Sequence, residues 1–358
     1  MRMLFPLIAG VMLAGPAMSG EYLLASIRPD KLIVVDAEKM AVDKVIELPA
    51  GSGPMAAVPV VSSDGRTAYV NVNRTESLLK VDLMTGETLA RADMSSDDER
   101  VKSLFGIALS PDGATLAVYQ SPVRMLPSEF QVQPTRIALY DTATMTLRST
   151  FPAPRQITLM AWSTDGSRIF GLGRDVYSFD PATGEQTGVQ PVHSWKADEY
   201  TLPDVLAVWS QYETSNRLVT PFYMARKDGA ADDPDTFRTG LLTLDLDSGQ
   251  LDMRDVRAMD VFYFSTASNP GRTRIYGAYN VLESFDAVKG EPIRRVSLPH
   301  SYYSVNVSHD GSTVWLGGAL SDLAAYDAET LERKGQVDLP GGASMSLSSV
   351  RMFQREDG

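Results

Sequence analysis

The sequence predicts an all-β protein, a seven-bladed β-propeller with four antiparallel strands per blade. Two recurring phrases carry this prediction: an apolar run that ends in Asp, found seven times, and an Asp-Gly pair between two alternating stretches. The aspartates recur every 39 to 65 residues, and a strand-rich period near ~40 residues is typical of propeller blades. The third observation is that the two ends of the chain supply complementary parts of one blade.

The apolar run that ends in Asp predicts the third strand of each blade and the turn after it. Examples are "LLKVDLMTG" and "VYSFDPATG", in which a Thr-Gly pair follows the aspartate closely. An Asp carboxylate bonds backbone N–H groups ahead of it and Gly accepts positive φ, so the phrase suits a tight turn. We therefore expect structural turn roles at Asp36, Asp82, Asp141, Asp180, Asp245, Asp286 and Asp327.

The second phrase predicts a hairpin between the first two strands of a blade. It reads "SSDGRTAYV", "SPDGATLAV" or "SHDGSTVWLG", with close variants in two further blades. Asp-Gly between two alternating strands is the strongest short-range hairpin signal. One blade departs from the pattern, because "WSQYETSNRLV" at residues 209–219 fills the same position with a longer polar turn.

The two ends of the chain predict how the ring closes. After the N-terminal residues come only three strand signals, "YLLASI", "KLIVVD" and "KVIELP", and no Asp-Gly hairpin precedes them. The segment "ASMSLSSVRMF" near the C-terminus is a lone strand. We expect this strand, at about residues 343–354, to complete the first blade as its inner strand, because closure leaves no free edge. Residues 20–358 then form a single propeller domain.

Residues 1–19 predict a cleavable signal peptide. Arg2 supplies the positive charge, residues 4–13 form a short apolar stretch, and residues 17–19 (Ala-Met-Ser) offer small side chains before the cleavage point. A retained membrane anchor is the alternative interpretation, although the apolar stretch is too short to span a bilayer. We expect a protein exported to the periplasm, without membrane insertion.

Composition argues against several classes of function. Without the signal peptide, 32 basic residues face 45 acidic ones, a balance of −13, and such a surface repels nucleic acid and anionic lipid. The chain has no cysteine, which excludes thiolate zinc sites, iron–sulfur sites and covalent haem attachment on this chain. Its three histidines fall in different blades, so we expect no metal site. Gly171 and Gly173 lack the third glycine and the following helix of a dinucleotide loop.

Extra chain length is concentrated on one rim of the predicted ring. The Asp-Gly and Asp-x-x-Gly turns are short and share one rim, whereas insertions at residues 91–102, 120–135, 191–203 and 223–239 belong to the other. Insertions gathered on one face of a repeat scaffold indicate its binding face. The inner strands begin at this loop-rich rim, and their first residues are rich in aromatic side chains. These rings either face a binding partner or fill the wedge between blades.

Longer segments of the sequence are more distinctive than the turns. "RVKSLFGIALSPDG", "TPFYMARKD", "MDVFYFSTASNP" and "LPHSYYSVNVSHDGSTVWLGGALSDLAAYD" resemble the β subunit of quinohaemoprotein amine dehydrogenase. The similarity runs from about residue 21 to 355 and includes idiosyncratic stretches as well as hairpins. The methylamine dehydrogenase heavy chain shares the architecture and is the nearest competing assignment.

The resemblance implies a periplasmic complex of three subunits that oxidises primary amines to aldehydes. In that family the large subunit carries two c-type haems, and the small subunit carries a quinone made from its own tryptophan cross-linked to cysteine. The propeller subunit holds no redox cofactor and helps to enclose the quinone site. We therefore expect cysteine tryptophylquinone and c-type haem in the partner subunits only. We expect no catalytic residue in this chain, and no activity from the chain alone.

Position on the loop-rich rim suggests roles in such a complex for side chains at the inner-strand starts, namely to wall an apolar amine pocket and to clamp the small subunit. Alternate residues of a strand point to opposite faces, so Phe262 and Phe264 should share one face and Tyr263 should take the other. The seven candidates are Phe105, Arg155, Phe262, Tyr263, His300, Tyr302 and Tyr303.

Two other classes of function suit a propeller of this composition. A free-standing lactonase-like hydrolase would use acidic residues and a divalent ion at the mouth of the tunnel. A plain interaction scaffold would have no activity of its own. Copurification separates the three hypotheses: the first predicts a haem-coloured complex, the second predicts lactone cleavage that a chelator abolishes, and the third predicts neither.

Overall fold

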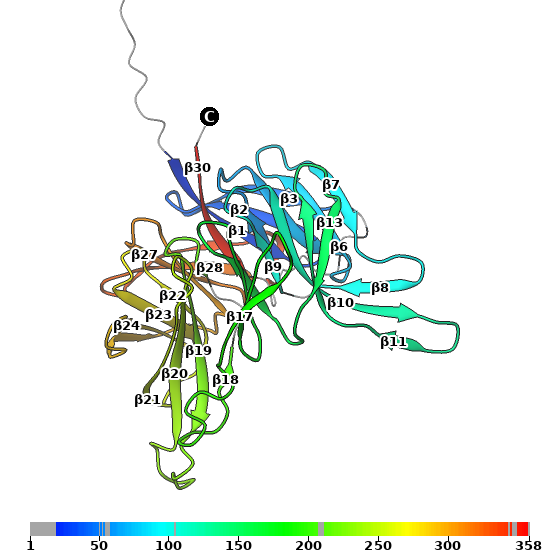
Figure 1. The fold of residues 1–358 in the computed structure, drawn as a ribbon. Coiled ribbons are helices and arrows are strands. Elements are labelled where there is room, and N and C mark those ends of the chain that lie inside the picture. The colour runs from blue at the N-terminus through cyan, green and yellow to red at the C-terminus, as the bar shows by residue number, and fades with distance from the viewer. Residues whose placement is uncertain are drawn as a thin grey trace, which may run out of the picture.

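Seven antiparallel sheets stand around a central axis as the blades of a propeller (Figure 1). The computed structural model describes residues 19–49, 51, 53, 58–103, 105–206, 211–342, 344–345 and 349–356. Among them the only helical element is a single 3-10 turn, η1 (Pro340–Gly342). The predicted all-β, seven-bladed architecture is confirmed. The signal peptide predicted for residues 1–19 lies outside the described residues, except for Ser19.

The first blade is assembled from both ends of the chain. Its strand order is β3-β2-β1-β30, so the last strand of the chain is the innermost one. β30 pairs antiparallel with β1, and Tyr22 lies opposite Phe353. The predicted closure of the ring is confirmed, although the strand begins at Val350 and not near residue 343. The strands are β1 (Ser19–Ile27), β2 (Lys31–Asp36), β3 (Ala41–Glu47) and β30 (Val350–Glu356).

The second, third and fourth blades follow in chain order, each with its first strand innermost. The third blade carries two additional strands, β8 and β11, which pair with an outer extension of β10. The second blade consists of β4 (Val60–Val61), β5 (Thr67–Val72), β6 (Ser77–Asp82) and β7 (Thr88–Asp93). The third consists of β8 (Glu99–Lys102), β9 (Ile107–Leu109), β10 (Thr115–Met125), β11 (Phe130–Val132), β12 (Arg136–Asp141) and β13 (Leu147–Pro152). The fourth consists of β14 (Leu159–Trp162), β15 (Ile169–Leu172), β16 (Val176–Phe179) and β17 (Gln186–Gln190).

The last three blades repeat the same four-stranded meander. In the fifth, the second and third strands are each nine residues long. This blade consists of β18 (Asp204–Val205), β19 (Arg217–Ala225), β20 (Phe237–Asp245) and β21 (Leu251–Ala258). The sixth consists of β22 (Tyr263–Ser268), β23 (Arg274–Tyr279), β24 (Val281–Asp286) and β25 (Pro292–Ser297). The seventh consists of β26 (Ser304–Val307), β27 (Thr313–Gly317), β28 (Asp322–Asp327) and β29 (Arg333–Asp338).

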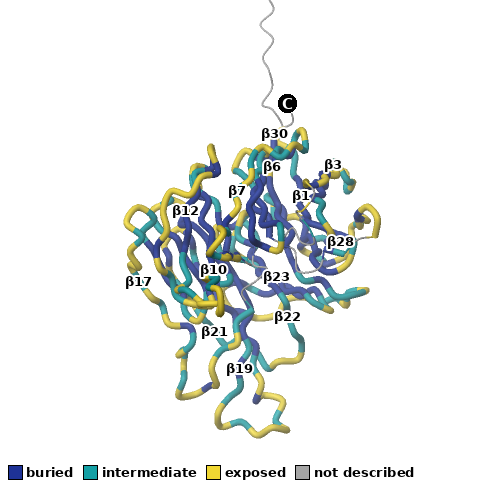
Figure 2. The backbone as a smooth tube through the Cα atoms, turned by 90° about the vertical axis from the view of Figure 1, so that its right-hand side faces the viewer, coloured by how far each residue is buried: buried dark blue, intermediate teal, exposed yellow. Residues whose placement is uncertain are grey.

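The core consists of apolar layers between neighbouring blades. Among the described residues, seven buried clusters are found, and each joins one blade to the next. In β1, Leu24 packs toward the second blade while Leu23 packs toward the seventh, because successive side chains of a strand point to opposite faces. The inner and middle strands are therefore buried on both faces, whereas the outermost strands and the loops are exposed (Figure 2).

The seven aspartates that end the third strands act within their turns. Each carboxylate accepts hydrogen bonds from backbone N–H groups two or three residues further along the chain. A second turn device recurs at the hairpins between first and second strands, where Ser62 and Ser110 donate to Asp64 and Asp112. These turns satisfy their own polar groups, so this rim of the propeller stays short.

The opposite rim carries the long connections, as the sequence predicts. The outer part of β10 projects with β8 and β11 as a three-stranded arm, and the β19–β20 hairpin projects as a second arm (Figure 1). The β19–β20 hairpin and the β10–β11 part of the first arm arise from connections between second and third strands, whereas β8 belongs to the connection from the second blade to the third. No helix long and apolar enough to cross a membrane occurs in the described part of the chain.

Candidate functional site

A cluster of five aromatic rings lies on the loop-rich rim, across the fifth, sixth and seventh blades. All five side chains are partly exposed. The ring of Phe264 is central, with its centroid 4.6 Å from those of Tyr279 and Tyr303 and 5.3 Å from that of Phe262. Tyr223 from β19 stacks on Phe262 at 4.8 Å and extends the cluster to the fifth blade. We call these five residues the aromatic cluster.

The start of β22 explains why these rings reach the surface. Phe262 and Phe264 contact each other and are partly exposed, whereas Tyr263 between them is fully buried, as strand alternation predicts. The pairing register with β23 shifts between Tyr263 and Ser265, so Phe264 occupies a β-bulge. A bulge re-aims the side chain at its position, and here it presents the ring of Phe264 to Tyr303.

Tyr263 does not contribute to the exposed site. Its hydroxyl donates to the buried carboxylate of Glu283, which also accepts from Arg257 and Arg295. Burial first, and then this bond to Glu283, raise the pKa of the Tyr263 phenol far above its usual value. Tyr223 braces the same backbone, because its hydroxyl donates to the carbonyl of Tyr263 and accepts from its N–H. The role proposed for Tyr263 in walling a pocket is therefore corrected: it supports the exposed rings from below.

Tyr302 is likewise buried, and its candidate role is corrected for the same reason. Its hydroxyl donates to Oδ2 of Asp322 at 2.6 Å, and Nε2 of His300 lies 3.0 Å from Oδ1 of the same carboxylate. The His300 and Tyr302 rings are 4.2 Å apart. Burial and the neighbouring Asp322 raise the pKa of the Tyr302 phenol. His300 remains partly exposed, so only the imidazole of this trio is accessible from the loop-rich rim.

Phe105 and Arg155 line a separate groove at the base of the arm formed by β8, β10 and β11. This groove has a volume of about 370 Å³ and is also lined by Val123, Val132 and Ile157. Phe105 is partly buried against the cluster between the second and third blades, whereas Arg155 is exposed. The structure thus brings Phe105 and Arg155 together on the loop-rich rim.

The seven candidate residues consequently fall into three groups. Phe105 and Arg155 line the groove at the base of the third-blade arm. Phe262 and Tyr303 belong to the aromatic cluster, and Tyr263, His300 and Tyr302 form buried or half-buried polar supports beside it. Sequence reasoning missed Tyr223 and Tyr279, because neither stands at the start of an inner strand; both come from second strands that end at the same rim.

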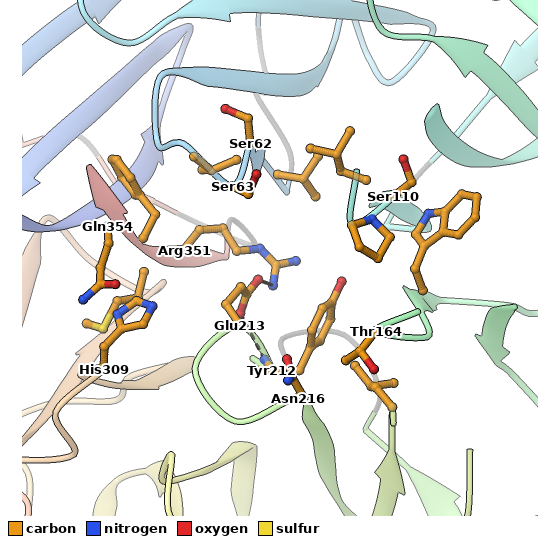
Figure 3. A pocket seen from close by; sticks show the side chains of 18 of the residues that line it. Ser62, Ser63, Ser110, Thr164, Tyr212, Glu213, Asn216, His309, Arg351 and Gln354 are labelled. Atoms are coloured by element: carbon orange, nitrogen blue, oxygen red, sulfur yellow. Dashed lines mark hydrogen bonds and ion pairs between the residues drawn. The ribbon is translucent and has the colours of Figure 1, made fainter. Parts of the chain in front are cut away.

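The short-turn rim contains a feature that sequence reasoning did not anticipate, a cavity of about 480 Å³ at the inner ends of several blades (Figure 3). The buried guanidinium of Arg351, from β30, reaches across it to Glu213 at 2.7 Å and Gln211 at 3.0 Å. Burial raises the pKa of Tyr212 to about 12. The sequence did contain a signal, since Gln211, Tyr212 and Glu213 belong to the first-to-second-strand connection that replaces the short glycine-containing hairpin with a longer polar turn.

The described residues offer hydrogen-bonding and apolar surfaces more than reactive centres. His309 lies at the short-turn rim, where its Nδ1 is 2.7 Å from Oε1 of Glu21. Within the described part of the chain, no group of three or more His, Cys, Asp or Glu side chains is placed to hold a metal ion. The surface most suited to binding is therefore the loop-rich rim, with its aromatic cluster, its groove and its two arms.

These features define a seven-bladed propeller with one elaborated rim, and comparisons with known proteins agree with this fold. No family model and no curated protein matches the sequence. Among solved structures, the chain is similar to hydrazine synthase from Kuenenia stuttgartiensis, with 15% identity, a TM-score of 0.59, and coverage of 80% of this chain and 86% of that one. It is also similar to a functionally unknown protein from Desulfotomaculum acetoxidans, with 11% identity, a TM-score of 0.62, and coverage of 94% and 99%. The likeness in both cases is one of fold.

Proposed function

We propose that this chain is the non-redox propeller subunit of a periplasmic quinohaemoprotein amine dehydrogenase complex, which oxidises primary amines to aldehydes. One structural observation carries the proposal: a single rim of the propeller combines two projecting arms with five partly exposed, mutually packed rings. Exposed apolar patches rimmed by polar residues mark interaction sites. The sequence resemblance supplies the particular complex.

In the proposed complex the partners hold the redox groups, and this chain shapes the space around the substrate. The quinone of the small subunit accepts the electrons of the amine and the haems of the large subunit carry them away. The faces of Phe264 and Tyr303 provide an apolar wall that also attracts an alkylammonium ion, because aromatic faces carry partial negative charge. The acidic balance of the chain favours the approach of the same cation.

The buried supports keep that wall in place. Glu283 is 2% exposed and binds Tyr263, Arg257 and Arg295 at once. These bonds join β21, β22, β24 and β25, and thereby tie the fifth blade to the sixth beneath the aromatic cluster. A wall fixed in this way excludes water from the space it borders without losing order when substrate binds.

Purification from the source organism tests the proposal. A tagged chain isolated from the periplasm should bring down a large haem-bearing chain and a small chain, and a primary amine should change the visible haem spectrum of that complex. The chain freed of its partners should not turn over amines. Amine oxidation by the isolated chain, or lactone cleavage that a chelator abolishes, would contradict the proposal. Capture without any haem-bearing chain would contradict it as well.

Substitution in the aromatic cluster tests the proposed wall. Phe264→Ala should lower kcat/KM for a primary amine by about tenfold, the equivalent of ~1.4 kcal/mol, which is within the range of aromatic contacts. Leu147→Ala is the matched control, because Leu147 is a 51% exposed apolar residue on the outermost strand β13. Equal kcat/KM values for the two variants, in complexes of equal subunit content, would show that the rings do not border the substrate.

A further inference from the structure

The arm of the third blade is built as a ribbon that leaves the propeller. Residues 115–120 of β10 pair with β12 inside the blade, whereas residues 121–125 pair with β8 on one side and β11 on the other. Figure 1 shows this ribbon projecting from the ring, at some distance from the longer arm of the fifth blade. β11 is therefore an edge strand, and among the strands that the structure describes it pairs with β10 alone.

The hydrogen-bond pattern leaves the outer edge of β11 open. The backbone N–H of Leu126 donates to the carbonyl of Glu129, and the backbone N–H of Gln133 donates to the carbonyl of Pro122. Bonded and non-bonded pairs alternate in an antiparallel ladder, so Phe130 and Val132 occupy positions whose N–H and C=O groups point away from β10. An extended chain can add to such an edge as a further strand.

The same two residues form an apolar surface on the arm. The side chains of Phe130 and Val132 are 77% and 64% exposed. They lie opposite Met125 and Val123 in β10, so these four side chains share one face of the ribbon. Val123 and Val132 also line the groove at the base of the arm, and the apolar face is thus continuous with that groove.

Charge indicates the chemistry of what binds there. Arg155 lines the groove and is exposed, and its side chain has no hydrogen bond or ion pair with another described residue. Arg155 is the one charged residue among those that line this groove, on a chain with 45 acidic residues against 33 basic ones. A carboxylate on the partner would be attracted to Arg155 and repelled by the acidic surface elsewhere, so it would direct the partner to this groove.

We infer that the outer edge of β11 and the adjoining groove dock an extended segment of a partner subunit, with apolar residues at alternate positions and a carboxylate that pairs with Arg155. The segment adds a strand next to Phe130 and Val132, and one of its apolar side chains enters the groove. This inference rests on the proposed function for the identity of the partner, which is a subunit of the haem-bearing complex.

Two pairs of variants test the docking surface. Val132→Lys places a charge on the apolar face, while Gln131→Lys adds the same charge to the next residue, on the opposite face of β11. Arg155→Gln removes the groove cation, while Arg124→Gln removes an exposed arginine from that opposite face. All four variants change exposed side chains, and equal thermal unfolding midpoints would verify that each one folds.

The readout is the haem absorbance recovered per tagged chain when each variant is purified from the periplasm. Val132→Lys should lower it about tenfold and Arg155→Gln by a smaller factor, whereas the two controls should match the wild type. If the wild type recovers the complex and Val132→Lys recovers just as much, the docking inference is wrong and the proposed function stands. If the wild type recovers no haem, the proposed function fails first. A purified wild-type dimer that Val132→Lys dissociates would show that the occupant is a second copy of this chain, and would overturn the inference.

Discussion

Replacing Phe353 by alanine weakens the joint between the two ends of the chain. The Phe353 side chain is 6% exposed, belongs to the cluster between the first and second blades, and stacks on Tyr22 at 5.7 Å. Truncation of a buried phenylalanine to alanine costs about 3 to 5 kcal/mol. We expect a loss of about 3 kcal/mol, at the lower end of this range, because Phe353 also borders the cavity of about 480 Å³ at the short-turn rim. Water from this cavity can enter the space left by the ring.

Urea unfolding followed by tryptophan fluorescence measures this loss in the free energy of unfolding. β30 supplies the inner strand of the first blade, so its weakening should lower the stability of the whole ring in one transition. Gln354→Ala is the control, since Gln354 is the exposed neighbour in the same strand, and a surface change of this kind stays within about 0.5 kcal/mol. Equal urea midpoints for the two variants would refute the view that ring closure stabilises the protein.

Three further outcomes follow from buried contacts and turns. Tyr302→Phe removes a donor from Asp322 and should lower the free energy of unfolding by about 2 kcal/mol, measured by urea titration. Gly240→Ala places a methyl group inside the ring of Phe222 and should cost about 1 to 3 kcal/mol by the same measurement. Bonds from neighbouring hydroxyl and backbone groups hold the pKa of Asp165 at about 2, below its ordinary 3.8. A carboxyl group whose pKa is lower in the folded protein than in the unfolded chain stabilises the fold at pH values above the unfolded-state pKa. This stability is lost as the carboxylate is protonated, so the unfolding temperature should fall as the pH drops from about 4 to 2.

Each of these predictions has a matched control. Tyr279→Phe should leave stability unchanged, because the Tyr279 hydroxyl has no hydrogen bond with another described residue. Gly188→Ala should be tolerated, since the added carbon would lie 3.7 Å from Oγ of Ser178, an ordinary contact. Ser163→Ala removes the main bond to Asp165 and should reduce the loss of stability in acid. A Ser163→Ala protein with an unchanged acid profile would contradict the assignment.

The fold was predictable because its determinants are local and repeated. The turn at Asp82 can be recognised from nine residues of sequence, and its carboxylate indeed accepts from the N–H groups of Met84 and Thr85. Ring closure was predictable from a count of strands at the two ends. The binding rim could be inferred as well, because the insertions of residues 120–135 and 223–239 fall in the same kind of connection and so leave the ring on the same side.

The candidate site was less predictable, because exposure depends on neighbours that are distant in the sequence. Tyr302 and Tyr303 are adjacent and chemically identical. The hydroxyl of Tyr302 nevertheless bonds Asp322 in the core, whereas the ring of Tyr303 packs against that of Phe264 at the surface. Neither Asp322 nor the bulge at Phe264 has a sequence signature that distinguishes it from ordinary strand residues. The cavity at the short-turn rim was unpredictable for the same reason, since Arg351 and Glu213, which form an ion pair there, are 138 residues apart in the sequence.

The amino-acid sequence by itself determined the number of blades, the closure of the ring and the side from which the long loops emerge. Those properties depend on residue alternation, turn chemistry and chain length, which act over a few residues at a time. Only the tertiary structure decided which aromatic rings are buried, which arginine is paired, and where a strand edge is left open. Those properties depend on which blades become neighbours, and on the desolvation and hydrogen bonding that each contact brings.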